Sequence, residues 1–210
     1  MTPTHHPPEE WLLAHASGVA TEGIDLLVAS HATLCPACRE RLDELVEVAG
    51  LYMSDVPMQP VPGIDALLAA LPEQDAPPQA PAPASHGLPA PLTPYVGSDA
   101  LEWKFVAPGV SRVDLGFDEG EMPVRLLSLR GGLKIPTHNH PGLERTLVLQ
   151  GGYDDESGTF VRGDIGIRDG SEPHYQVIHR GEPCIALVVA DHPITPVGLK
   201  SRVLSWFFSA

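Results

Sequence analysis

The chain has 210 residues, with 27 acidic and 13 basic side chains and a formal net charge of −14. So acidic a chain is not expected to bind nucleic acid directly, because phosphate contacts need patches of lysine and arginine. Only three cysteines are present, so no disulfide framework is available and a reducing compartment is favoured. No basic residue precedes Arg39, and no apolar run approaches the roughly 20 residues of a membrane span. We therefore expect a cytoplasmic protein without a membrane anchor.

Residues 1–71 show the apolar spacing of helices. The pattern predicts four of them, at about 7–17, 21–34, 36–50 and 64–71, with Thr21 as the N-cap of the second. The fourth is shorter than the roughly 12 to 15 residues at which an isolated helix becomes even marginal in water. It must therefore pack, either on this domain or in the groove of a partner.

Three side chains of the kinds that bind metals lie at the junction of the second and third helices. His31 and Cys35 are one helical turn apart, and Cys38 follows one turn later. Two thiolates and an imidazole suit tetrahedral Zn²⁺, which leaves one ligand to be found. A histidine near the start of the chain can close a Cys₂His₂ site; the candidates are His5, His6 and His15, of which we choose His6.

Two other interpretations of the cysteine motif compete with a metal site. The thiols could simply be buried beside an unrelated histidine, or they could form a thioredoxin-like redox pair. A redox pair should follow a strand in a βαβ unit, and the surroundings of Cys35 are helical instead. We therefore favour a structural metal, which would contribute directly to folding in a domain with few large side chains.

The charge of residues 1–71 is strongly acidic. This region contains ten acidic side chains and two basic ones, Arg39 and Arg41, for a net charge of −8. Two interpretations of this charge are open. Either the helices simply have a solvated acidic surface, or the surface mimics DNA or binds a basic partner. Together with the metal motif, the charge favours a basic protein partner.

A proline-rich stretch separates this region from the rest of the chain. Between Pro72 and Pro94, prolines alternate with alanines, a composition typical of an extended, semi-rigid polyproline II spacer. We therefore expect a multidomain protein, with a small all-α domain (1–71), a linker (72–94) and an all-β domain (95–210).

Residues 95–210 consist of short β-type runs between glycines and acidic turns. Candidate strands lie at 124–129, 145–150, 165–168 and 185–189. This spacing is typical of an all-β barrel or sandwich. The apolar run at 203–208 is too hydrophobic for a free end, so we expect it to pack back.

A second group of metal-type residues lies within this half. His138 and His140 are two apart and can share one face of a strand, and Glu144 can join them after a turn at 141–142. Two solvated or core histidines are the alternative. The spacing around these residues resembles, position by position, the first motif of the cupin superfamily. It runs Gly132, five residues, His138, one residue, His140, three residues, Glu144, six residues, Gly151.

The second cupin motif is matched less completely. Gly163 and His174 fall at the expected positions, but Asp169, Ser171 and Ile178 replace the usual proline, glycine and asparagine. The resemblance implies a jelly-roll barrel with the metal ligands His138, His140, Glu144 and His174. Such a set accepts Zn²⁺, Mn²⁺, Fe²⁺, Ni²⁺ or Cu²⁺.

The spacing His-x-x-x-Cys-x-x-Cys with an upstream histidine resembles the zinc-binding anti-sigma domain of bacteria. That resemblance implies His6, His31, Cys35 and Cys38 as the zinc ligands. Helical zinc domain, linker and cupin in this order resemble the ChrR family of anti-sigma factors. The resemblance implies a protein that holds an extracytoplasmic-function (group IV) sigma factor through the helical domain. It would release that factor on an oxidative signal, such as singlet oxygen, sensed through the metal-bound cupin.

A metalloenzyme of the cupin dioxygenase or isomerase type, with an appended zinc domain, is the rival hypothesis, and a purely structural barrel metal is a third. We do not expect an enzyme, because the sequence shows no further group of catalytic acids or bases beside the barrel metal ligands. An imidazole ligand is the expected oxidant target. Cys184 is the alternative, although such a cysteine is more often a buried small hydrophobe.

Overall fold

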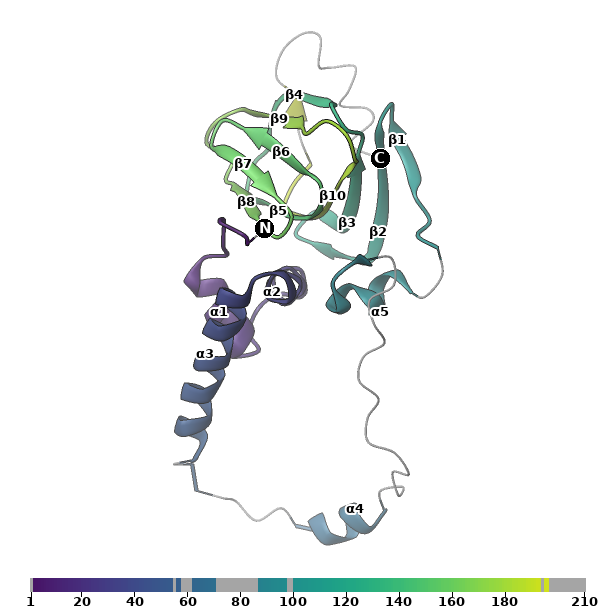
Figure 1. Cartoon of the computed structure of the whole chain (residues 1–210). Helices are drawn as coiled ribbons and strands as arrows, with labels where there is room; N and C mark the ends of the chain where they lie inside the picture. The colour runs from purple at the N-terminus through teal and green to yellow at the C-terminus, as the bar shows by residue number, and fades with distance from the viewer. Residues whose placement is uncertain are drawn as a thin grey trace.

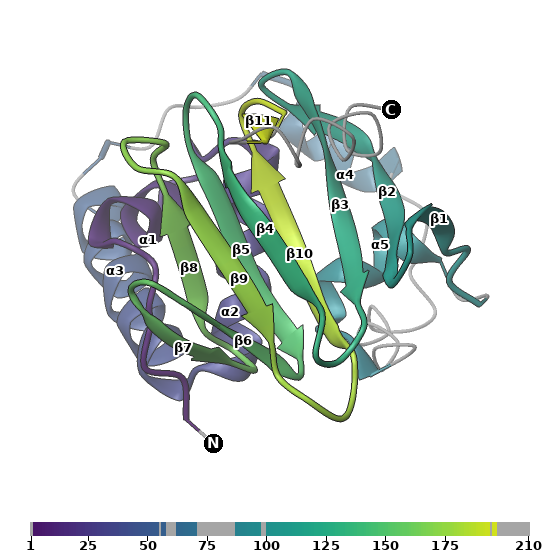
Figure 2. The same ribbon diagram turned by 90° about the horizontal axis from the view of Figure 1, so that it is seen from above.

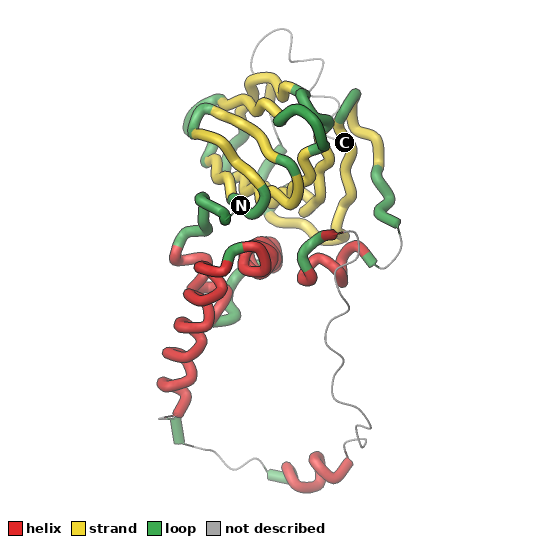
Figure 3. The backbone as a smooth tube through the Cα atoms, viewed as in Figure 1, coloured by secondary structure: helices red, strands yellow, loops and turns green. Residues whose placement is uncertain are grey.

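The computed structural model describes residues 2–54, 56–57, 62–70, 87–97, 100–193 and 195–196. Helices fill the first part of the chain and antiparallel strands the later part (Figures 1 and 3). The predicted fold class, a helical region followed by a cupin-type barrel, is confirmed. Most of the proline-rich stretch and the apolar run at 203–208 lie outside the described residues.

The N-terminal helices are α1 (Glu9–Ala16), α2 (Glu22–Leu34), α3 (Pro36–Ser54) and α4 (Ile64–Ala70). α1 carries two acidic residues in its first turn, where the helix dipole favours them. α3 continues through Gly50, at which the sequence predicts its end, because a glycine costs only about 1 kcal/mol in a helix interior. α4 buries none of its own residues, so it is not packed on the helical domain.

The N-terminus of α2 is tied to the barrel. Thr21 occupies the predicted N-cap position, but its side chain makes no capping bond. Its hydroxyl donates instead to Oε1 of Glu119 (2.6 Å), and the Gly23 N–H donates to the other oxygen of the same carboxylate (3.3 Å). The Glu119 carboxylate of β2 therefore accepts a free backbone N–H at the N-terminus of α2 and stabilises the positive end of the α2 dipole.

The barrel follows two short helical turns, η2 (Ala90–Leu92) and α5 (Thr93–Val96). Leu88 and Leu92 are buried there and join the core, although the sequence places them in the linker. Proline-rich composition hides them, because an isolated leucine between prolines shows no periodicity. The strands are β1 (Lys104–Ala107), β2 (Val110–Glu119), β3 (Met122–Leu129), β4 (Lys134–Asn139), β5 (Glu144–Gln150), β6 (Gly152–Asp155), β7 (Gly158–Val161), β8 (Ile165–Arg168), β9 (His174–Ile178), β10 (Cys184–Ala190) and β11 (Thr195–Pro196).

Within the described residues these strands form two antiparallel sheets (Figure 2). The larger has the order β1-β2-β3-β10-β5-β8, and the smaller the order β11-β4-β9-β6-β7. One hydrophobic cluster fills the space between strands of both sheets, including Val148, Tyr153, Ile178 and Cys184. The alternation of inward and outward side chains follows the period of two that a strand imposes.

A second cluster lies between the larger sheet and the helices. Leu126 of β3 and Leu187 of β10 face Leu26 and Leu27 of α2 in this cluster. The opposite side of α2 contributes Ile24 and other residues to a third cluster with α1 and α3. α2 therefore belongs to two cores at once, and α1 and α2 lie directly against the barrel in Figure 1.

Candidate functional site: two clusters of metal-ligating side chains

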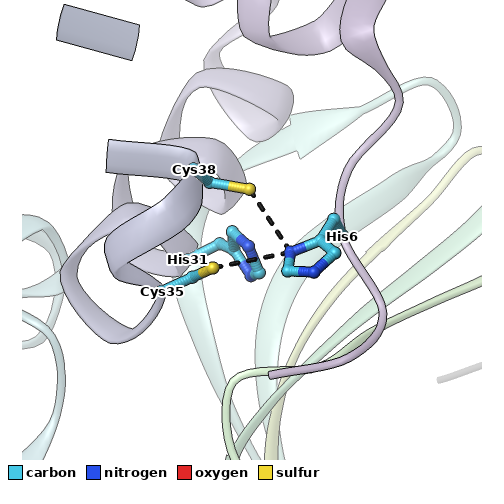
Figure 4. A group of neighbouring side chains, drawn as sticks. All are labelled: His6, His31, Cys35 and Cys38. Carbon is cyan, nitrogen blue, oxygen red and sulfur yellow. Dashed lines mark hydrogen bonds between the residues drawn. The ribbon is translucent and has the colours of Figure 1, made fainter. Parts of the chain in front are cut away.

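The corner between α2 and α3 gathers the first cluster. Cys35 breaks the helix with extended dihedrals (φ −117°, ψ 105°), and Pro36 begins α3. His31 and both cysteines then face His6, which comes from the extended N-terminal segment (Figure 4). One ligand atom from each residue lies within 4.8 Å of all the others. Nδ1 of His6 is 3.5 Å from Sγ of Cys35 and 3.4 Å from Sγ of Cys38.

This arrangement fits a tetrahedral zinc ion. Zinc bonds of about 2.3 Å to sulfur and 2.0 Å to nitrogen, at the tetrahedral angle, place the two ligand atoms about 3.5 Å apart. Nδ1 of His31 lies 2.7 Å from the carbonyl oxygen of Gly163, and its buried Nε2 has no hydrogen-bond partner among the described residues. A metal-bound histidine typically donates its second N–H to such a carbonyl. The unpaired Nε2 is therefore the atom that faces a metal.

Burial sets the protonation of these ligands. It lowers the pKa of His31 to about 4, so the imidazole is neutral at pH 7, as a ligand must be. Burial, together with the neighbouring Cys35, raises the pKa of Cys38 to about 12. A divalent cation reverses that preference, because it stabilises the thiolate directly. The cluster therefore suits a bound cation, and its thiols are costly to ionise without one.

The barrel holds the segment that carries His6. The fully buried carboxylate of Asp164 accepts the backbone N–H of Thr4 (2.6 Å) and of His5 (2.9 Å), and the His5 carbonyl accepts the N–H of Ile165 (3.1 Å). Burial alone would raise the pKa of Asp164, but the backbone N–H donors outweigh it and hold the pKa below its ordinary value. An ionised carboxylate of the barrel therefore anchors the residues next to His6.

The other two histidines proposed for this cluster lie elsewhere. The ring of His5 packs on Phe160, with centroids 4.3 Å apart, and its Nδ1 lies 3.6 Å from Asp164. His15 makes an ion pair with Asp25 (2.7 Å). The structure therefore brings His6, and neither of these two, to the thiols.

The second cluster lies in the barrel. His138 of β4, Glu144 at the start of β5 and His174 at the start of β9 each place a ligand atom within 4.8 Å of the others. β4 and β9 pair with His138 directly opposite His174. His140 follows the end of β4 and borders this group, with its Nε2 4.0 Å from Oε2 of Glu144 and its ring 5.2 Å from that of His174.

The histidines of the barrel are oriented by the backbone. Nδ1 of His138 lies 3.0 Å from the carbonyl of Pro136, and Nδ1 of His140 lies 3.2 Å from that of Gly142. Nε2 of His140 and both ring nitrogens of His174 have no hydrogen-bond partner among the described residues. Burial lowers the pKa of His174, and the neighbouring His138 adds to the effect. Buried imidazoles with unpaired nitrogens fit a metal ion, and the ligand types accept several transition metals.

Cys184 is fully buried in the barrel, and burial raises the pKa of its thiol to about 12. A thiol that stays protonated at neutral pH is a poor target for oxidants. The interpretation of Cys184 as a small buried hydrophobe is confirmed.

One short strand connects the two clusters. β8 begins directly after Gly163, whose carbonyl contacts His31 of the first cluster, and Asp164, which holds the backbone of Thr4 and His5 next to His6. The last residue of β8, Arg168, pairs with Glu144 of the second cluster. Gly163 has a φ of +96°, and a Cβ there would lie 2.5 Å from Cγ of Pro3. The sequence identifies Gly163 only as a motif glycine and gives no signal for Asp164, because His31, the partner of Gly163, is 132 residues away, and Thr4, a partner of Asp164, is 160 residues away.

Comparison with known proteins agrees with these features. The ChrR cupin-like domain family matches residues 93–194. The chain is 38% identical to the anti-sigma-E factor ChrR of Cereibacter sphaeroides, over 99% of both chains. It is also similar to a chain in the crystal structure of Rhodobacter sphaeroides SigE in complex with the anti-sigma ChrR, with a TM-score of 0.74, 36% identity, and coverage of 90% of this chain and 100% of that one.

No helix among the described residues combines the length and the apolar character that crossing a bilayer requires. The 38% identity extends over almost the whole length of the chain, so the similarity covers the helical region as well as the barrel. The chain belongs to the ChrR family of anti-sigma factors.

Proposed function

We propose that this protein binds an extracytoplasmic-function sigma factor through its helical part and keeps it from core RNA polymerase. The observation that carries the proposal is the likeness, over 90% of the chain, to a protein crystallised in complex with SigE. A partner that must meet RNA polymerase places the complex in the cytoplasm. The same likeness favours this function over a cupin metalloenzyme, because it covers the helical part as well as the barrel.

The exposed side of α3 and α4 is the surface we assign to the sigma factor. Only Cys38 and Leu42 of α3 are buried. The two helices expose a series of large apolar side chains that no described residue covers: Val46, Val48, Leu51, Tyr52, Met53, Ile64, Leu67 and Leu68. Such a series suits helix-in-groove docking, in which an apolar helical face fills a partner's groove.

The acidic side chains of α3 support a partner with a basic surface. Glu40, Asp43, Glu44 and Glu47 lie exposed along α3. Arg41 is paired with Glu44 (2.7 Å) and with Glu9. An acidic rim beside an apolar centre steers a basic surface into register. The apolar residues would supply affinity and the carboxylates would supply orientation.

We assign Zn²⁺ to His6, His31, Cys35 and Cys38 as a structural ion, and a transition metal, zinc among the candidates, to His138, His140, Glu144 and His174. The first ion would fix the α2–α3 corner from which the docking helix projects. We propose a division of labour between the helical region (1–71) and the barrel (95–210), joined by the linker (72–94), although α2 and two leucines of the linker also pack into the barrel core. The barrel would receive an oxidative signal, with singlet oxygen as the candidate and a ligand imidazole as its target.

β8 offers a route between the two parts. A change at Glu144 would alter its pairing with Arg168, and the other end of β8 carries the Asp164 carboxylate that holds residues 4 and 5. A signal acts only if the two states differ in affinity for the partner. Release of the N-terminal segment would make that difference, because it moves His6 and with it the support of α3.

The test is a binding titration with an extracytoplasmic-function sigma factor from the same organism. Replacing Leu51 and Met53, both exposed, by glutamate should weaken binding by at least about 30-fold, the equivalent of one hot-spot contribution of roughly 2 kcal/mol. Phe105→Glu, an equally exposed site on β1 of the barrel, is the matched control and should bind as the parent does. Parent-like binding by the double variant would reject this surface.

A further inference from the structure

A cavity beside the barrel cluster has a polar end and an apolar end. Its volume is about 90 Å³, several times the roughly 15 Å³ that one water molecule needs. Arg125, Thr146 and Glu144 line it near the metal-type residues, and Leu129 and Val110 line it farther along the strands. In the sheet register, Arg125 and Thr146 both pair with Val188, whereas Leu129 pairs with Cys184. Four residues along a strand separate the two ends, a distance of roughly 13 Å.

Arg125 is the unusual residue in this cavity. It is 92% buried, yet it makes no ion pair with any carboxylate of the described residues. Its hydrogen bonds run from Nε to the Pro123 carbonyl (3.1 Å) and from Nη2 to the Met122 sulfur (3.9 Å), and neither acceptor is charged. Burial is costly for a guanidinium without a counter-charge. An anion in the cavity would remove that cost.

The carboxylates nearest Arg125 are engaged by other groups. Asp114, its neighbour across β2 and β3, contacts Nε of Arg112 (3.3 Å) and Nζ of Lys104 (3.4 Å). Glu144 belongs to the metal-type cluster. Burial and the adjacent Arg112 lower the pKa of Arg125, whereas Asp114 and Glu144 oppose the shift only in part. Histidines apart, the charged residues that line the cavity are Arg112, Arg125 and Glu144, so the lining carries one positive charge in excess, and a divalent ion held by the metal-type cluster would add to it.

We propose that the barrel cavity binds a short-chain carboxylic acid as its anion, with the carboxylate on Arg125 and the aliphatic chain toward Leu129 and Val110. Arginine suits this role, since its planar fork can hold both carboxylate oxygens at once. Thr146 pairs with Val188, as Arg125 does, and its hydroxyl offers a further hydrogen-bond donor to the carboxylate. The volume of the cavity suits about six non-hydrogen atoms, the size of butyrate, whose chain would extend from Arg125 part of the way toward Leu129 and Val110. Nothing in this assignment depends on the sigma factor.

The test uses the full-length, metal-loaded chain and two probes of equal shape, butyrate and its neutral amide, butyramide. Calorimetric titration should show at least tenfold tighter binding of butyrate. Arg125→Met should abolish that preference, whereas Arg125→Lys, which keeps the charge, should retain a preference for the anion. Arg180→Met is the matched control, because Arg180 is exposed and outside the cavity. It should bind as the parent does.

Two outcomes would overturn the assignment. Equal affinity of the parent for butyrate and butyramide, or no binding of butyrate, would show that Arg125 does not select an anion. An undiminished preference in a folded Arg125→Met variant would show that the metal cluster alone holds the carboxylate. If Arg125→Met does not fold, the comparison of the two probes in the parent and in Arg125→Lys still decides the proposal.

Discussion

The helical part and the barrel each enclose a buried cluster of metal-ligating residues, but the two clusters have different surroundings. In the helical part, the core consists of seven buried residues, two of which are the ligands Cys35 and Cys38 themselves. In the barrel, two sheets and larger aliphatic clusters surround the ligands. A metal in the first case would take the place of a hydrophobic core. A metal in the second would occupy a scaffold that backbone pairing already holds.

Removing a thiol ligand should therefore have the largest effect. Cys35→Ser or Cys38→Ser should unfold the helical part and abolish sigma-factor binding, because structural zinc contributes apparent free energies of roughly 10 to 16 kcal/mol in small domains. Circular dichroism should show loss of the helical signal while the sheet signal remains. Cys184→Ala, at the buried cysteine of the barrel, is the control and should keep its helices. A thiol variant that stays helical and binds its partner after chelation would contradict the comparison.

The shared face of α2 provides the next test. Leu27 is fully buried against the barrel, so Leu27→Ala should lower the free energy of unfolding by about 2 to 5 kcal/mol. Val19→Ala, at a position that is 75% exposed, should change it by less than about 0.5 kcal/mol. Urea titration measures both. A loss below about 1 kcal/mol for Leu27→Ala would show that the helical part stands independently of the barrel.

A wedge at the contact between the two parts should have a smaller effect. Gly163→Ala introduces a Cβ 2.5 Å from Pro3, whereas Gly181→Ala introduces one at a similar positive φ with no atom within 4 Å. Both substitutions share the backbone strain, so their difference isolates the steric overlap, which should cost roughly 1 to 3 kcal/mol. We expect faster zinc transfer to a chelator and faster amide exchange at residues 4 and 5 in Gly163→Ala only. Equal rates in the two variants would remove this contact from the coupling route.

The barrel ligands should matter least for folding and most for the response. His138→Ala removes a ring that packs on other imidazoles, so the change in unfolding free energy should be only about 1 kcal/mol. The barrel should lose its metal, and the sigma factor should stay bound when singlet oxygen is generated. Metal analysis and a transcription assay measure these effects. A parent-like induction in a barrel proven free of metal would exclude the cupin as the sensor.

Local patterns in the sequence predict most of this architecture. The helices, the break at Cys35 and the spacing of His138 and Glu144 follow from neighbours a few residues apart, and the structure reproduces them. The second face of α2 is not predictable in this way. Leu26 and Leu27 look like any apolar pair until β3 and β10 are placed against them.

The supporting contacts of the clusters escaped prediction for the same reason. Thr21 reads as a helix cap, but a carboxylate 98 residues later, on Glu119, accepts its hydroxyl instead. The sequence gives no signal for Asp164, and only the fold shows that it is fully buried and bonded to the N-terminal segment. Pairing across such distances is set by the topology of the barrel, which no local pattern encodes.

The bond between Thr4 and Asp164 spans 160 positions, which affects the order in which the protein can be assembled during translation. His6 is synthesised before any strand of the barrel, yet the strand that positions it is completed only after most of the barrel has been synthesised. Contacts of such high sequence separation form late, because closure of a long loop must precede them. A nascent chain therefore cannot complete the cluster of metal-ligating side chains at the α2–α3 corner, and we expect only finished copies of the protein to hold a sigma factor made at the same time.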